Sequence, residues 1–197
     1  MSRRLGSWLL ATFLTAGVVA IVRQRWEAQA VRRGTLPRAS AAAALVPRRP
    51  HPAWAEQLAG WVPTRPATPL GRLVATVWAG PLTVVGFGLA ALAGAHPRWD
   101  VDLGCFVARG VGGPSRVALR AVGASANTVG LVVLSPGPRP DPVLLAHEAV
   151  HARQAERLGP LLLPAYVLLS ARFGYRDNPL EQAARLGARR ALPGRPH

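Results

Sequence analysis

The sequence is organised around residues 141–159, DPVLLAHEAVHARQAERLG, which predict one helix. The aspartate and proline at its start suit the N-cap and the first helical position. A Gly-Pro pair directly after Leu158 ends it. We therefore expect a helix over residues 142–158, with the motif HEAVH in its middle turns.

Two histidines of this motif point to a metal site. His147 and His151 are four residues apart, so their imidazoles share one helix face. That spacing suits two ligands of a tetrahedral zinc ion, and Glu148 is placed to reach a water held on the metal. The chain has only five histidines. A chance match is therefore on the order of one in several hundred.

A third zinc ligand is expected at Glu181, in the first turn of a helix that begins at Asn178-Pro179 and runs to about Leu192. An alternative stays open, because Asn178 and Glu181 are also spaced as an N-cap and a capping-box glutamate. The remaining histidines lie beside hydrophobic segments or at the chain end (His51, His96 and His197).

The motifs His147-Glu148-Ala-Val-His151 and Asn178-Pro179-Leu-Glu181-Gln-Ala-Ala184 together resemble the gluzincin class of zinc metallopeptidases. The Glu-x-x-Ala form is similar to that of membrane-embedded members, including those that trim prenylated proteins. The resemblance covers residues 128–192, about a third of the chain. It implies that His147, His151 and Glu181 bind Zn²⁺, that Glu148 is the general base, and that the substrate is a peptide or protein.

One position departs from those relatives. They carry an aspartate near the Glu-x-x-Ala segment that supports a ligand histidine, whereas this chain has Arg185 there. Asp177 is the candidate for that supporting contact.

The chemistry that the resemblance implies also needs a donor to the oxyanion. Zinc lowers the pKa of a bound water from about 15.7 toward 7, and Glu148 would accept its proton. Tyr175 is the first candidate for the donor and Tyr166 the second. Tyr175 could equally be a loop aromatic that packs beside the second helix, and Arg176 carries the same ambiguity.

The segment before the zinc helix predicts β-structure, so the expected fold class is α+β with a short antiparallel sheet. Residues 103–109, 116–122 and 128–134 are short apolar runs separated by glycine-rich turns. The last run would lie beside the zinc helix, either as a simple buried strand or as an edge that binds an extended peptide. Residues 161–171 are apolar but too short to span a bilayer, which favours a buried or membrane-surface helix.

The N-terminal half predicts membrane attachment. Residues 5–22 are apolar and favour an uncleaved anchor over a cleaved signal, and residues 73–95 are long enough for a transmembrane helix. A pair of buried helices broken near Pro81 is the alternative for the second segment. The expected division is an anchor at 1–22, a loop or linker at 23–72 with short helices over 39–45 and 54–61, a transmembrane helix at 73–95 and a zinc domain at 96–197.

Composition supports this assignment. Half of the residues are hydrophobic, and all 24 basic residues are arginines in a chain of net charge +15. Contact with anionic membrane lipids is the expected use of that charge, and no nucleic-acid-binding motif is present. The arginines of residues 23–72 favour a cytoplasmic loop, which would place the zinc domain outside the cell membrane, although the opposite orientation stays open. The sole cysteine, Cys105, is expected to be a small buried apolar residue.

The sequence thus predicts a membrane-anchored zinc metallopeptidase. The alternative is a non-catalytic membrane protein that keeps the zinc site as a structural or interaction element. A structural zinc site is closed by four protein ligands, so the three ligands found here favour catalysis. The ligands alone do not exclude hydrolysis of a bond other than a peptide bond.

Overall fold

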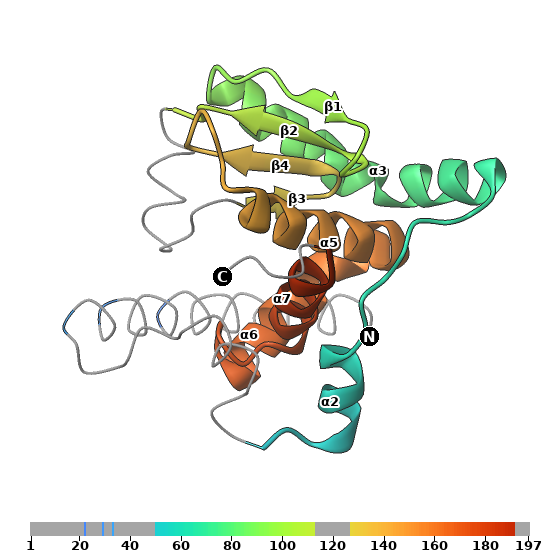
Figure 1. Cartoon of the computed structure of the whole chain (residues 1–197), viewed down its shortest axis with the longest axis vertical. Coiled ribbons are helices and arrows are strands. Elements are labelled where there is room, and N and C mark those ends of the chain that lie inside the picture. The colour runs from blue at the N-terminus through green and yellow to red at the C-terminus, as the bar shows by residue number, and fades with distance from the viewer. Residues whose placement is uncertain (1–21, 23–28, 30–32, 34–49, 113–126, 192–197) are drawn as a thin grey trace, which may run out of the picture.

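The computed structural model describes residues 22, 29, 33, 50–112 and 127–191. Over these ranges the chain has an α+β fold (Figure 1). In chain order the elements are α2 (Ala53–Ala59), α3 (Pro69–Leu92), β1 (Arg98–Asp100), β2 (Cys105–Arg109), β3 (Asn127–Val129), β4 (Val132–Ser135), α5 (Pro142–Leu158), the 3-10 turn η2 (Gly159–Leu161), α6 (Leu162–Phe173) and α7 (Pro179–Ala191).

The four strands form a mixed sheet in the order β1-β2-β4-β3. The outer pairs are antiparallel, but β2 and β4 run parallel, so the prediction of an antiparallel sheet is wrong at the centre of the sheet. Antiparallel neighbours can be joined by short turns, whereas a parallel pair needs a longer crossover, which the chain makes between β2 and β4. The expected strand over 128–134 is instead a hairpin, because Gly130 at φ +63° turns the chain between β3 and β4. The strand expected over 116–122 lies outside the described residues.

Helices cover both faces of the sheet (Figure 1). All four residues of β4 are buried. Leu131 and Val133 pack in a core cluster with Leu145 of α5, whereas Val132 and Leu134 pack in a second cluster with Ala90 of α3. Because successive side chains of a strand point to opposite faces, β4 is the shared centre of both clusters.

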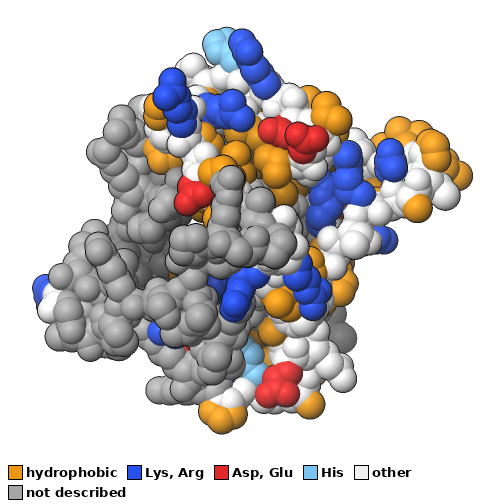
Figure 2. All heavy atoms as spheres, viewed as in Figure 1, with side chains coloured by type: hydrophobic (Ala, Val, Ile, Leu, Met, Phe, Trp, Pro, Cys, Tyr) orange, Lys and Arg blue, Asp and Glu red, His pale blue; other side chains and the backbone are white. Residues whose placement is uncertain are grey.

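Helix α3 buries small residues and exposes large ones. Its buried positions follow helical spacing and are all small (Ala75, Ala79, Thr83, Gly86 and Ala90). Its outward side carries exposed Leu73, Val77, Val84 and Leu92. Hydrophobic side chains gather on the projecting end of this helix in Figure 2. The helix is therefore joined to the protein along one face and apolar on the other.

By length and composition, α3 is the one helix in the described ranges that could cross a membrane. Only 28 % of its most apolar stretch of 18 residues is buried. The core helix of a soluble protein can be equally long and apolar. It corresponds to the helix expected over 73–95 and continues through Pro81 without a break.

The described part of the predicted linker contacts the C-terminal helices. The short helix expected over 54–61 is present as α2, which packs against α7. Arg157 of α5 donates to the Thr64 carbonyl at 2.9 Å. The apolar segment 5–22, apart from Val22, and the helix expected over 39–45 lie outside the described residues. Cys105 is buried as expected, and burial raises its pKa to about 11.

The packing of α3 on the sheet can be tested at Gly86. A Cβ there would lie 2.8 Å from Val132 Cβ, whereas a Cβ at Gly88 meets nothing within 4 Å. We expect Gly86→Ala to lower the free energy of unfolding by about 1–3 kcal/mol through overpacking. The matched change Gly88→Ala should be neutral or stabilise by about 1 kcal/mol through helix propensity. Thermal unfolding in detergent measures both; equal effects would contradict the described packing.

Candidate metal centre

Local sequence signals set the ends of the helix that carries the histidines. The Asp141 side chain accepts a hydrogen bond from the Val143 amide at 2.9 Å, and Pro142 occupies the first turn. Gly159 ends the helix at φ +55°, and a Cβ there would lie 2.5 Å from the Trp78 indole of α3. The observed bounds of α5 match those expected from the sequence. His147 and His151 are thereby held on one side of a helix that is capped at its start and packed closely against α3 at its end.

Helix α7 brings Glu181 to the same place. Asn178 caps this helix, accepting from the Leu180 amide at 2.9 Å, and its own amide donates to Ser170 Oγ at 2.8 Å. The Glu181 side chain is turned toward α5, so Asn178 provides the cap and the carboxylate faces the imidazoles. The structure thus brings together the three ligands predicted from the sequence.

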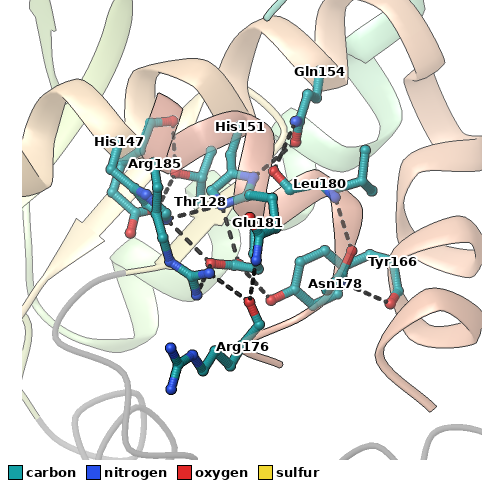
Figure 3. A network of polar contacts seen from close by, with 12 residues as sticks. Thr128, His147, His151, Gln154, Tyr166, Arg176, Asn178, Leu180, Glu181 and Arg185 are labelled. Atoms are coloured by element: carbon teal, nitrogen blue, oxygen red, sulfur yellow. Dashed lines mark hydrogen bonds and ion pairs between the residues drawn. The ribbon is translucent and has the colours of Figure 1, made fainter. Parts of the chain in front are cut away.

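The three side chains form a triangle of ligand atoms (Figure 3). The two Nε2 atoms of His147 and His151 lie 3.2 Å apart. Glu181 Oε2 lies 3.4 Å from His147 Nε2, and Oε1 lies 3.2 Å from His151 Nε2. Tetrahedral bonds of 2.0–2.1 Å to a central ion would separate its ligands by about 3.4 Å. The group is therefore of a size that could hold a metal ion.

The Glu181 carboxylate also shows why a cation fits. Its Oε2 atom is buried and accepts no hydrogen bond from the described residues. Its nearest cationic or donor groups are His147 Nε2 at 3.4 Å and the Arg185 guanidinium at 3.6 Å, both longer than a normal hydrogen bond, and a metal ion would bond to it directly. Oε1 by contrast accepts from the Tyr166 hydroxyl at 2.7 Å.

The charges of the metal-free site are coupled. Burial alone would lower the pKa of His151, but the nearby Glu181 carboxylate outweighs burial and raises that pKa to about 9. Burial would raise the pKa of Glu181, yet the charge of His151 and the contacts with both histidines hold it well below its usual range. At neutral pH the site thus contains a carboxylate and a protonated imidazole, and a metal would have to displace that proton.

Gln154 orients the second histidine. Its Oε1 atom lies 2.8 Å from His151 Nδ1 and its Nε2 donates to the Leu180 carbonyl at 3.1 Å. Because an amide oxygen only accepts, Nδ1 carries the hydrogen and Nε2 faces the site. Asp177, the residue expected to support a ligand histidine, is buried, and at His151 Nδ1 the contact is made by Gln154. Gln154 was missed, although its position three residues after His151 on one helix was the available signal.

Thr128 orients the expected general base. Its hydroxyl, on strand β3, lies 2.6 Å from Glu148 Oε2 and 3.2 Å from the Glu148 carbonyl. The hydroxyl has one hydrogen, so donation to the carboxylate oxygen is the stronger bond. Glu148 is itself buried. The sequence offered no signal for this contact, which depends on how β3 packs against α5.

A cavity of about 310 Å³ lies beside these groups. One part of its wall is polar and includes Asn127, Thr128, Glu148, His151, Tyr166, Tyr175 and Glu181. The other part is formed by Leu82, Val85, Val129, Gly130, Leu162 and Leu163. The cavity therefore joins the expected base, two metal-ligand candidates and both tyrosine candidates to an apolar surface.

Both tyrosines remain protonated at neutral pH. The pKa of Tyr166 is raised by burial and then by the Glu181 charge, and the pKa of Tyr175 is raised mainly by the Glu181 charge and then by burial. Each phenol is therefore a potential hydrogen-bond donor to a group in the cavity.

Arg185 approaches the carboxylate from the side opposite to Tyr166 (Figure 3). Its guanidinium lies 3.6 Å from Glu181 Oε2, donates to the Arg176 carbonyl at 2.5 Å and lies over the Tyr175 ring at 5.7 Å. The position where the resembled peptidases carry an acid thus holds a cation that contacts a candidate ligand. Arg176 contributes its backbone carbonyl to this arrangement.

No family model matches this chain, and no curated protein or solved structure matches it. The assignment of a candidate metal centre thus depends on the geometry of its side chains alone.

Removal of one imidazole should abolish metal binding. We expect purified protein to hold about one zinc ion per chain and His147→Ala to lose it, because two ligands bind zinc far more weakly than three. His96→Ala, at an exposed histidine away from the site, is the matched control. Atomic emission measures the zinc content of all three proteins. An unchanged zinc content in His147→Ala would reject the ligand assignment.

Zinc binding should release a proton. A His151 pKa of about 9 means that this imidazole is protonated at pH 7 in metal-free protein, whereas a zinc ligand must be neutral. We expect the apparent zinc affinity to rise with pH and to level off above about pH 9. Calorimetric titration in two buffers of different ionisation enthalpy measures the released proton. Identical heats in both buffers would contradict this charge state.

Proposed function

We propose that this chain is a membrane-anchored zinc metallopeptidase of gluzincin type. One observation carries the proposal: Glu148 lines the same cavity as His151 and Glu181 of the three-ligand group. A metal site with three protein ligands and an adjoining cavity is the arrangement expected of a catalytic centre.

Two imidazoles and a carboxylate suit zinc among the common divalent ions. In the proposal His147, His151 and Glu181 hold the ion. Bound zinc supplies a water with a pKa lowered to about 7 and polarises a carbonyl oxygen.

Glu148 would accept the proton of the attacking water and pass it to the leaving amine. A carboxylate in a buried pocket performs such transfers when it is held within hydrogen-bond reach of the water. The Thr128 hydroxyl fixes one carboxylate oxygen at 2.6 Å, which leaves the other oxygen for that contact. Thr128 is thus a positioning residue in this scheme.

Tyr166 and Tyr175 are the candidates to stabilise the oxyanion. Both line the cavity and both are neutral donors. Tyr166 donates to Glu181 Oε1, and the Tyr175 hydroxyl also hydrogen-bonds to Glu181, so either phenol would have to turn from this carboxylate to reach an oxyanion. Tyr175 stays the first candidate and Tyr166 the second.

The sheet supports a peptide as substrate. Within the described residues, strand β3 is at the edge of the sheet, and all three of its residues line the cavity. An extended peptide could pair with such an edge by main-chain hydrogen bonds while its scissile bond lies near Glu148.

Attachment to the cell membrane rests on α3, and the arginine distribution favours an extracytoplasmic catalytic domain. The alternative is a non-catalytic membrane protein that keeps the metal as a structural or interaction element. Arg185 favours this alternative, because it stands where the resembled peptidases carry an acid that supports a ligand histidine.

Replacement of the expected general base distinguishes a catalytic from a non-catalytic metal site. We expect Glu148→Gln to retain zinc and to lower peptide hydrolysis at least about 100-fold, because the amide cannot accept the proton. Glu56→Gln, at an exposed glutamate of α2, should leave both quantities unchanged. Zinc content and cleavage of a mixed peptide library measure the effects. Full hydrolysis by Glu148→Gln, or no hydrolysis by the zinc-loaded parent protein, would reject the peptidase proposal.

A further inference from the structure

We infer that the cavity binds a large apolar side chain of a membrane-associated polypeptide, and that this substrate enters between α3 and α6. The inference rests on the proposed peptidase function and names its substrate class. It follows from the wall, the entrance and the charges of the cavity.

The apolar part of the cavity wall includes branched side chains from two helices. Leu82 comes from α3, and Leu162 and Leu163 come from α6. A side chain that enters this space leaves water for an apolar surface, which favours leucine or phenylalanine. A charged side chain would lose its hydration there without gaining a partner from this wall.

The entrance is marked by lining residues that are also exposed. Val85 of α3 is 52 % exposed and Leu163 of α6 is 51 % exposed, so the apolar wall continues to the outer surface. The same two helices also carry exposed Val84 and Leu168, which do not line the cavity. The entrance thus opens onto the surface of the helix that is long and apolar enough to cross a membrane.

The charges of the cavity agree with an apolar substrate. The chain carries 24 basic residues, yet none is among the cavity-lining residues. The ionisable lining groups are those of the polar wall, of which Glu148, His151 and Glu181 are assigned to the metal and the base. Apart from His151 and the ion that it would help to hold, the described lining therefore offers no cation to recognise an acidic side chain.

The test uses the full chain, loaded with zinc and reconstituted in phospholipid vesicles. Internally quenched peptides of one sequence carry leucine or aspartate beside the scissile bond. Each is made both free and fused to a membrane-spanning segment. We expect the anchored leucine peptide to be cleaved with a kcat/KM at least about tenfold above that of the anchored aspartate peptide. The kcat/KM of the anchored leucine peptide should also exceed that of the free leucine peptide.

Two matched pairs of variants locate the subsite. Leu163→Ala should lower kcat/KM for the leucine peptide about tenfold, whereas Leu168→Ala, equally exposed on the same helix but outside the cavity, should not. On α3 the corresponding pair is Val85→Ala and Val84→Ala. Equal cleavage of leucine and aspartate peptides, or equal effects within each pair, would overturn the subsite. Equal cleavage of free and anchored peptides would overturn entry from the membrane.

Failure of the peptidase proposal gives a different result. If the parent protein cleaves nothing, binding of the anchored leucine peptide is measured by fluorescence anisotropy with zinc-loaded Glu148→Gln protein. Binding that falls with Leu163→Ala but not with Leu168→Ala supports the apolar subsite without hydrolysis. Binding that is insensitive to both changes, or absent, overturns it.

Discussion

The structure depends on the burial of one carboxylate between two imidazoles. Glu181 is almost fully enclosed, and one of its oxygens accepts no hydrogen bond from the described residues. A charge in such a place requires a compensating cation. His151 and Arg185 supply it without metal, and an ion bound to all three side chains would supply it more completely. The packing of α7 against α5 encloses this carboxylate, so the stability of that packing depends on the cation that compensates the charge.

The other half of the structure is governed by the small-residue face of α3. Alanine, threonine and glycine let this helix approach the sheet closely, and Gly130 of the β3–β4 turn contacts the α3 backbone near Leu82 and Thr83. Thr83 also accepts the Leu131 amide at 3.1 Å. The large apolar side chains that remain then point outward. The division of α3 into a face of small residues and a face of large ones thus packs this helix on the sheet. It also forms the apolar exterior and part of the cavity wall.

The predictable parts of this protein are those with local causes. The ends of α5 follow from an aspartate, a proline and a glycine, and the ligand pair follows from helical periodicity. Glu181 could be predicted because it lies in a recognisable first turn. Thr128 and the parallel pairing of β2 with β4 could not, because both depend on contacts between distant segments. Gln154 lies between these cases: its spacing from His151 is local, but its bond to the Leu180 carbonyl is a tertiary contact.

That bond has a consequence for cooperativity. One amide group joins the ring of His151 to the backbone of α7, close to Glu181. A shift of α7 would rotate the imidazole and withdraw the carboxylate in the same movement. An ion bound at this site should therefore hold α7 more firmly against α5, and loosening of α7 should weaken both the imidazole and the carboxylate as ligands.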